Sequence, residues 1–185
     1  MTAACPAMTP QGAALLAQYN RWMNERLFDA AARLDAAALA ADRGALFGSI
    51  LGTLNHIAVA DIIWLRRFAR HRVASPVLEA LGGFPAPSSL RETLAPDLAG
   101  LRRCRTRLDE LIVRWTSELT LEQLSSELCY ANMAGAVSTR SFAAVLQHFF
   151  NHQTHHRGQA STLLFQAGVD VGTTDLLALI PRSDA

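Results

Sequence analysis

The stretch from Phe47 to Phe68 is apolar almost all the way round a helix, and its middle reads L-G-T-L-N-H-I-A-V-A-D-I-I-W-L. A surface helix confines its apolar residues to one stripe, so a helix that is apolar on every side has to pack on more than one side. The sequence therefore predicts a helix over about residues 45–71 that lies in the centre of its domain.

Three more segments carry apolar residues at the three- and four-residue steps of an amphipathic helix. The first begins after Thr9, whose hydroxyl can cap free N–H groups, and runs to about Leu34. The last is capped by Ser138 or Thr139 and ends at Gly168, since glycine commonly follows the last turn of a helix. These segments predict the long elements of a bundle.

The remaining long helix, which ends at about Leu119, has two candidate starts. Residues 89–92 (S-L-R-E) fit a capping box, and Pro96 then produces either a kink or a restart. Glycines and prolines before this helix predict a loop with one helical turn near residues 77–81, and residues 120–124 predict another short turn.

Residues 125–140 contain Gly135 and no helical stripe, which predicts a small hairpin or an irregular loop. The chain after Gly168 is apolar enough to pack back onto the bundle as one short helix. Ala, Leu and Arg are abundant and β-branched residues are few, which favours helix over sheet. The predicted fold is all-α: one four-helix-bundle domain over residues 1–185, with short extra helices and with residues 1–8 disordered.

Charge and cysteine content exclude several classes of protein. The 17 basic and 16 acidic residues give a net charge of +1, so the sequence contains no basic field for a nucleic acid. All 17 basic residues are arginine, which excludes Schiff-base lysines and a P-loop lysine. Cys5, Cys104 and Cys129 form no C-x-x-C pair, and no run of about 18 apolar residues could span a bilayer. We therefore expect a cytoplasmic protein without a nucleic-acid or membrane partner.

Four of the six histidines lie between His148 and Gln159, in the sequence H-F-F-N-H-Q-T-H-H-R-G-Q. His152 and His156 are one helical turn apart, so both side chains can bind one metal ion from the same face. His56 would supply a third nitrogen if its helix packed against this one, although a lone buried histidine is more often only a hydrogen-bonded core residue. Three imidazoles suit zinc, nickel, iron or cobalt better than magnesium or calcium.

Three segments of the chain are distinctive: Y-N-R-W-M-N, F-G-S-I-L-G-T-L-N-H-I-A-V-A-D-I-I-W-L and H-F-F-N-H-Q-T-H-H-R-G-Q. Together they resemble the DinB-like/YfiT-like family of metalloenzymes. Members of that family are four-helix bundles, often dimeric, in which a histidine of the second helix and an H-x-x-x-H of the fourth bind a metal. By position, the resemblance implies a homodimer with His56, His152 and His156 as metal ligands and with zinc or nickel as the metal.

The same resemblance implies a function, because relatives with known activities use low-molecular-weight thiols. We expect a metal-dependent enzyme of thiol-transferase or hydrolase type that acts on a small molecule, with the thiol as co-substrate. The alternative is a non-catalytic metal-binding or stress-response protein of the same fold. A third interpretation is a structural bundle whose histidines only pack.

No residue near the histidines is an obvious general base. On a helix Asp61 points about 140° away from His56, so we expect a buried or helix-pairing carboxylate. His148 and His155 either support the metal ligands or fill structural positions, and Gln159 is expected to border the site.

Other polar residues are expected at the surface of the bundle. Asn20 and Asn24 lie beside the apolar stripe of the first helix, where contact with water is favoured over a bond to a neighbouring helix. Arg157 is expected to form a surface ion pair, and the arginines of residues 102–107 to pair with acidic residues of their own helix.

Overall fold

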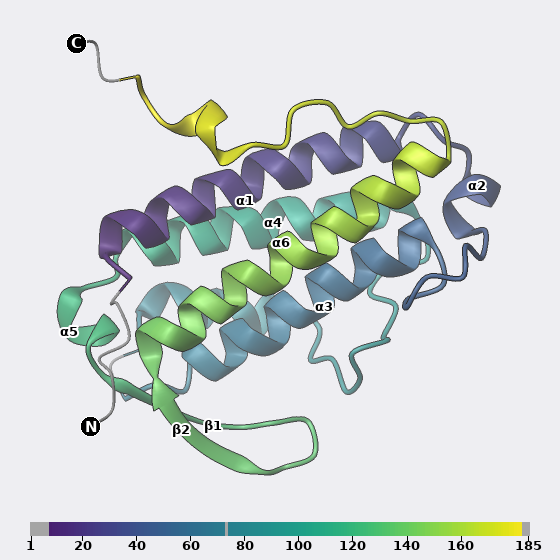
Figure 1. The fold of residues 1–185 in the computed structure, drawn as a ribbon. Helices are drawn as coiled ribbons and strands as arrows, with labels where there is room; N and C mark the ends of the chain where they lie inside the picture. The colour runs from purple at the N-terminus through teal and green to yellow at the C-terminus, as the bar shows by residue number, and fades with distance from the viewer. Residues whose placement is uncertain (1–7, 73, 183–185) are drawn as a thin grey trace.

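The computed structural model describes residues 8–72 and 74–182, which form a helical bundle with one small hairpin (Figure 1). The four long helices are α1 (Pro10–Ala31), α3 (Ile50–Phe68), α4 (Leu98–Ser117) and α6 (Phe142–Gln166). α1 packs against α4 and α6, and α3 packs against the same two helices, so α1 and α3 lie diagonally across the bundle. The predicted all-α fold is confirmed. The prediction of disorder for residues 1–8 concerns a segment of which only Met8 is described.

Short elements connect and follow the long helices. They are α2 (Ala36–Ala40), η1 (Pro76–Gly83), α5 (Leu121–Leu124), β1 (Glu127–Ala131), β2 (Val137–Ser141) and η2 (Leu176–Leu179). β1 and β2 pair antiparallel with Cys129 opposite Thr139, and their hairpin projects from one end of the bundle (Figure 1). The tail returns along α1, where the Tyr19 hydroxyl donates to the carbonyl of Thr174 at 2.7 Å. The predicted short helical turns and hairpin are thus present.

Side chains that accept from free backbone N–H groups determine where the first helices begin. Thr9 caps α1 as predicted, with its hydroxyl 3.0 Å from the backbone nitrogen that it caps. α1 ends at Ala31, earlier than predicted, and Asp35 caps the separate helix α2. α3 begins later than predicted because Ser49 is its cap, with Oγ 3.0 Å from the nitrogen of Gly52.

The structure decides between the two candidate starts of the third long helix and corrects the predicted cap of the fourth. Residues 89–92 form a turn, in which the Glu92 carboxylate accepts from a preceding backbone nitrogen at 2.8 Å. α4 begins after Pro96, as the restart alternative predicted, and the Asp97 carboxylate accepts from a backbone nitrogen of the first turn at 2.7 Å. α6 is capped by Ser141, since residues 138 and 139 pair within the hairpin.

The core contains a cluster of aromatic rings from three helices. Phe68 of α3 lies 4.9 Å from Trp115 of α4 and 5.9 Å from Phe149 of α6, measured between ring centroids. Burial of each large apolar side chain stabilises the fold by roughly 1.5–3 kcal/mol, so this cluster holds α3 and α6 together. Every residue from Thr53 to Ile63 is buried, as expected for the helix that is apolar on all sides. Within the described ranges, no helix combines the length and apolarity needed to cross a membrane.

Candidate metal centre

The packing of α3 against α6 brings together His56, His152 and His156. One imidazole nitrogen from each lies within 4.8 Å of the others, and the Nε2 atoms of His56 and His156 are 3.2 Å apart. Two tetrahedral ligands at about 2.0–2.1 Å from one ion lie about 3.3 Å apart, so this separation is close to that of a bound pair. His56 and His156 are buried and His152 is half-buried. The three histidines could therefore hold one metal ion between two helices.

Hydrogen bonds on the far side of two rings determine which nitrogen carries the hydrogen. His56 Nδ1 lies 2.9 Å from the carbonyl oxygen of Leu90, which can only accept, so Nδ1 is the donor. His156 Nδ1 lies 2.7 Å from Oε1 of Gln159, which also accepts. In the neutral rings both Nε2 atoms therefore carry lone pairs, and these lone pairs face each other. A cation placed between them would turn this repulsion into two bonds.

Gln159 is itself held in one orientation. Its Nε2 lies 3.1 Å from Nε2 of His155, so the amide donates to His155 while its oxygen accepts from His156. Gln159 borders the histidine cluster as predicted, and His155 supports it through this amide. His148 is exposed, with its ring 6.1 Å from that of His152 and 5.2 Å from that of Trp64.

Burial favours the neutral form of all three imidazoles. Burial, together with the neighbouring histidines, lowers the pKa of His152 to about 3. Burial also lowers the pKa of His56 and His156, although the Leu90 carbonyl and Gln159 act in the opposite direction. At neutral pH the lone pairs are available, as metal binding requires.

Phe47 covers one side of the cluster. Its ring stacks on His56 with centroids 3.7 Å apart and meets His156 edge-on at 5.5 Å. An apolar ring beside a metal site limits the access of water and lowers the local dielectric constant. The half-exposed His152 therefore lies on the more open side of the cluster.

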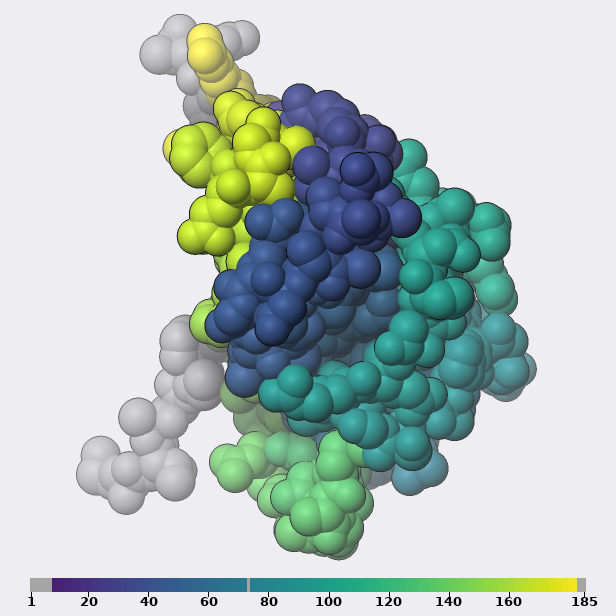
Figure 2. Space-filling view, turned by 90° about the vertical axis from the view of Figure 1, so that its right-hand side faces the viewer, coloured from purple at the N-terminus to yellow at the C-terminus, as the bar shows by residue number. Residues whose placement is uncertain are grey.

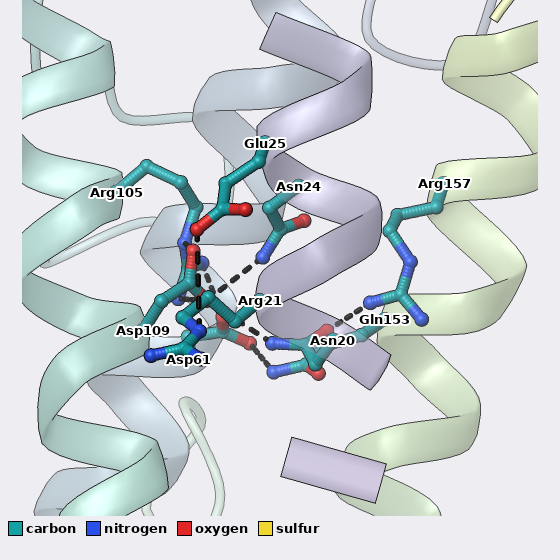
Figure 3. Close-up of polar contacts among 9 residues, drawn as sticks. All are labelled: Asn20, Arg21, Asn24, Glu25, Asp61, Arg105, Asp109, Gln153 and Arg157. Atoms are coloured by element: carbon teal, nitrogen blue, oxygen red, sulfur yellow. Dashed lines mark hydrogen bonds and ion pairs between the residues drawn. The ribbon is translucent and has the colours of Figure 1, made fainter. Parts of the chain in front are cut away.

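The residues that follow the two α6 histidines point into the interior of the bundle (Figure 3). Gln153 donates to Asp61 of α3 at 2.6 Å, and Arg157 donates to Asn20 of α1. Arg105 of α4 also donates to Asp61, through Nη1 at 2.5 Å. Next to the histidines, polar contacts from α6 therefore reach α3 and α1 directly. They reach α4 through Asp61, which also accepts from Arg105.

Asp109 of α4 is the second carboxylate of this network. It accepts from Asn24 at 2.9 Å, from Asn20 at 3.3 Å and from Nε of Arg105 at 3.1 Å (Figure 3). Arg105 Nη2 lies 3.0 Å from Asp109 Oδ1 as an ion pair that lacks hydrogen-bond geometry. Burial raises the pKa of Asp109 to about 6 and also raises the pKa of Asp61, although Arg105 lowers both. The network is satisfied mainly by partners within the bundle.

The network corrects two predictions. Asn20 and Asn24 do not meet water: they are 1% and 2% exposed, because Asp109 offers both a partner inside the bundle. Arg157 does not lie at the surface: it is 3% exposed and donates to a neutral amide, and none of the ion pairs among the described residues involves it. The prediction of a buried, helix-pairing Asp61 is confirmed, as is pairing within α4 between Arg105 and an acidic residue one turn away.

Some residues of the site could not be found from the sequence, and others left a signal. The acceptor for His56 is the backbone carbonyl of Leu90, and because every residue has a backbone carbonyl, the residue type at position 90 does not indicate this contact. Phe47 lies before α3, and only the folded chain places its ring on His56. Gln153 and Arg157, in contrast, are polar residues one turn apart on a packed helix, a spacing that places both on one face, where each would need a polar partner if that face is buried.

The fold and the site define a class of protein: a four-helix bundle with a three-histidine cluster that could bind a metal ion between facing helices. The chain belongs to the DinB family, whose profile matches residues 8–182. It is similar to the curated "Protein DinB" of Bacillus subtilis (strain 168), with 26% identity over 161 residues that cover 86% of this chain and 88% of the relative. No solved structure matches the chain. The family resemblance inferred from the sequence is confirmed.

Proposed function

We propose that the chain is a metal-dependent enzyme that acts on a small molecule, with His56, His152 and His156 as ligands of one divalent transition metal. The observation that carries this proposal is the pair of Nε2 lone pairs that face each other at 3.2 Å in a buried site. Three imidazoles leave at least one position for water or substrate, as catalytic metal sites do. Nitrogen ligands favour zinc or nickel over magnesium and calcium.

The reaction that we propose is thiol transfer to an electrophile, or hydrolysis, with a low-molecular-weight thiol as co-substrate of the transferase. When bound, the metal would favour the thiolate over the thiol or acidify a water molecule. The chain contributes orientation and exclusion of water. The Leu90 carbonyl and Gln159 hold two imidazoles in place, Phe47 covers one side, and the half-exposed His152 leaves the other side accessible.

A thiol-consumption assay tests this proposal. Untagged protein loaded with zinc or nickel should consume cysteine or glutathione in the presence of 1-chloro-2,4-dinitrobenzene, and should hydrolyse an activated ester if it is a hydrolase. A chelator should reduce either rate to the level without protein, because the metal activates the nucleophile. Stoichiometric metal with neither activity would favour the non-catalytic metal-binding or stress-response protein instead.

We also propose a cytoplasmic homodimer. Cys104 and Cys129 are unpaired, which suits a reducing compartment. Large apolar side chains such as Val137 and Leu177 are 70% and 75% exposed, and the family resemblance implies a dimer. Light scattering should give twice the 20.1 kDa mass of one chain, and the mass of a single chain would contradict the dimer.

A further inference from the structure

A hollow of about 460 Å³ lies between the connection from α2 to α3 and the C-terminal half of α6. Figure 2 shows this end of the bundle, where the connection (blue) abuts α6 (yellow-green). Arg43, Ala45 and Leu46 line it from the connection, and Gln159, Thr162 and Leu163 line it from α6. Pockets for small molecules have volumes of about 300–1,000 Å³, so the hollow is large enough for a metabolite.

Arg43 gives the hollow a positive charge that no acidic residue in its lining neutralises. Among the described residues, none of the ion pairs involves Arg43. Its Nη2 donates to the carbonyl of Ala38 at 3.1 Å, and its buried Nε has no hydrogen-bond partner. A guanidinium without a counter-ion binds carboxylate or phosphate groups well, because several of its donors can engage the same anion.

A second hollow shows what a neutralised lining looks like. The hollow between α1 and α4 is lined by three arginines, but Glu25, Asp29, Asp109 and Glu110 line it as well. Two of its arginines, Arg102 and Arg105, form ion pairs with aspartates of that lining. Arg102 and Arg105 are neutralised by these carboxylates, whereas the guanidinium of Arg43 has no ion-pair partner among the described residues and is available to an anionic ligand.

The rest of the Arg43 hollow suits a short apolar chain. Leu46 is 60% exposed, and a molecule in the hollow could cover it. Gly158 also lines the hollow, and a Cβ at this position would meet no atom within 4 Å. The wall is therefore apolar in part and open at the glycine.

Gln159 connects this hollow to the histidine cluster, because its Oε1 accepts from His156 Nδ1 at 2.7 Å. We propose that the hollow binds a small organic anion, with a carboxylate or phosphate group on Arg43 and a short apolar chain against Leu46 and Leu163. The anion is the substrate of the proposed metalloenzyme or a part of it. Only this last statement rests on the proposed function, since the binding itself needs no metal.

Binding of hexanoate tests the proposal, with hexylamine as a ligand of equal chain length and opposite charge. Titrations followed by NMR should show hexanoate binding to the wild-type chain, and hexylamine binding at least about tenfold more weakly, because Arg43 attracts only the anion. The same hexanoate affinity is expected in His152→Ala, which lacks a proposed metal ligand. Equal binding of the two ligands would overturn the proposal.

Two variants and one control locate the site. Arg43→Gln should weaken hexanoate binding about tenfold or more, because the variant lacks the guanidinium. Gly158→Leu should abolish binding because the leucine side chain fills the hollow. This variant should still fold, because leucine is a better helix former than glycine. Arg114→Gln, a change at an exposed arginine of α4, should have no effect. Unchanged binding in both Arg43→Gln and Gly158→Leu would contradict the site.

Loss of binding in His152→Ala alone would place hexanoate on the metal, which overturns the hollow but not the metalloenzyme. Normal hexanoate binding in a chain that takes up no metal would support the hollow as a binding site and overturn the metalloenzyme.

Discussion

His152→Ala should abolish stoichiometric binding of zinc or nickel and with it the stabilisation that the metal confers on the fold. A ligand that binds only the folded chain stabilises it by about 2.7 kcal/mol when present at 100 times its dissociation constant. His152 is half-buried, so the metal-free variant should melt close to the metal-free wild type. Elemental analysis of untagged protein and thermal melts with and without chelator measure both effects.

His148→Ala is the matched control, because His148 is an exposed histidine one turn away on the same helix. It should retain full metal content. Gln159→Leu keeps all three proposed ligands but removes the acceptor for His156 Nδ1, so its metal affinity should fall by about 10–100-fold without vanishing. Equal metal content in His152→Ala and the wild type would refute the ligand assignment, and an unchanged affinity in Gln159→Leu would refute the role of the amide.

Arg105→Met should lower the free energy of unfolding by about 3–5 kcal/mol. Arg105 is 3% exposed and lies between the carboxylates of Asp61 and Asp109, at 2.5 Å from the first and 3.0 Å from the second. Methionine fills similar space but leaves both buried carboxylates without a guanidinium. Urea unfolding at pH 7 measures the loss.

Arg102→Met provides the control on the same helix. Arg102 pairs with Asp29, but their side chains are 42% and 72% exposed, so its loss should cost no more than about 1 kcal/mol. Similar losses in the two variants would contradict the view that burial makes the Arg105 pairs important.

The pH dependence of Arg105→Met has a definite sign. Burial already raises the pKa of Asp109 to about 6 in the presence of Arg105, and removal of the guanidinium raises it further. A carboxyl group whose pKa is higher in the folded than in the unfolded chain stabilises the fold at low pH and loses this contribution as the pH rises through the folded pKa. The variant should therefore recover part of its lost stability between pH 7 and pH 5. A loss that grows as the pH falls over this range would contradict the assignment.

Helix content and helix order could be predicted from the chain because apolar periodicity is a property of neighbouring residues. Thr9 and residues 89–92 illustrate where the prediction of helix boundaries succeeds and where it fails. Thr9 begins α1 as expected, since its hydroxyl accepts from the backbone nitrogen of Gly12. At residues 89–92 the Glu92 carboxylate bonds to the nitrogen of Ser88, so the capping-box pattern gives a turn and α4 starts at the next good cap. Patterns of residue type cannot decide between two local hydrogen bonds of similar strength.

Two of the three candidate ligands can be assigned to one face from local spacing, because His152 and His156 lie one turn apart on any helix. The position of His56 beside them depends on the fold, since the approach of α3 to α6 depends on core packing around Phe68. The same holds for the interior network. Its partners come from all four long helices, so Asn20 is polar beside an apolar stripe in the sequence and becomes a buried link between Arg157 and Asp109 in the fold. Periodicity assigns a residue to a face, whereas the hydrogen-bond partner that makes burial favourable lies on another helix.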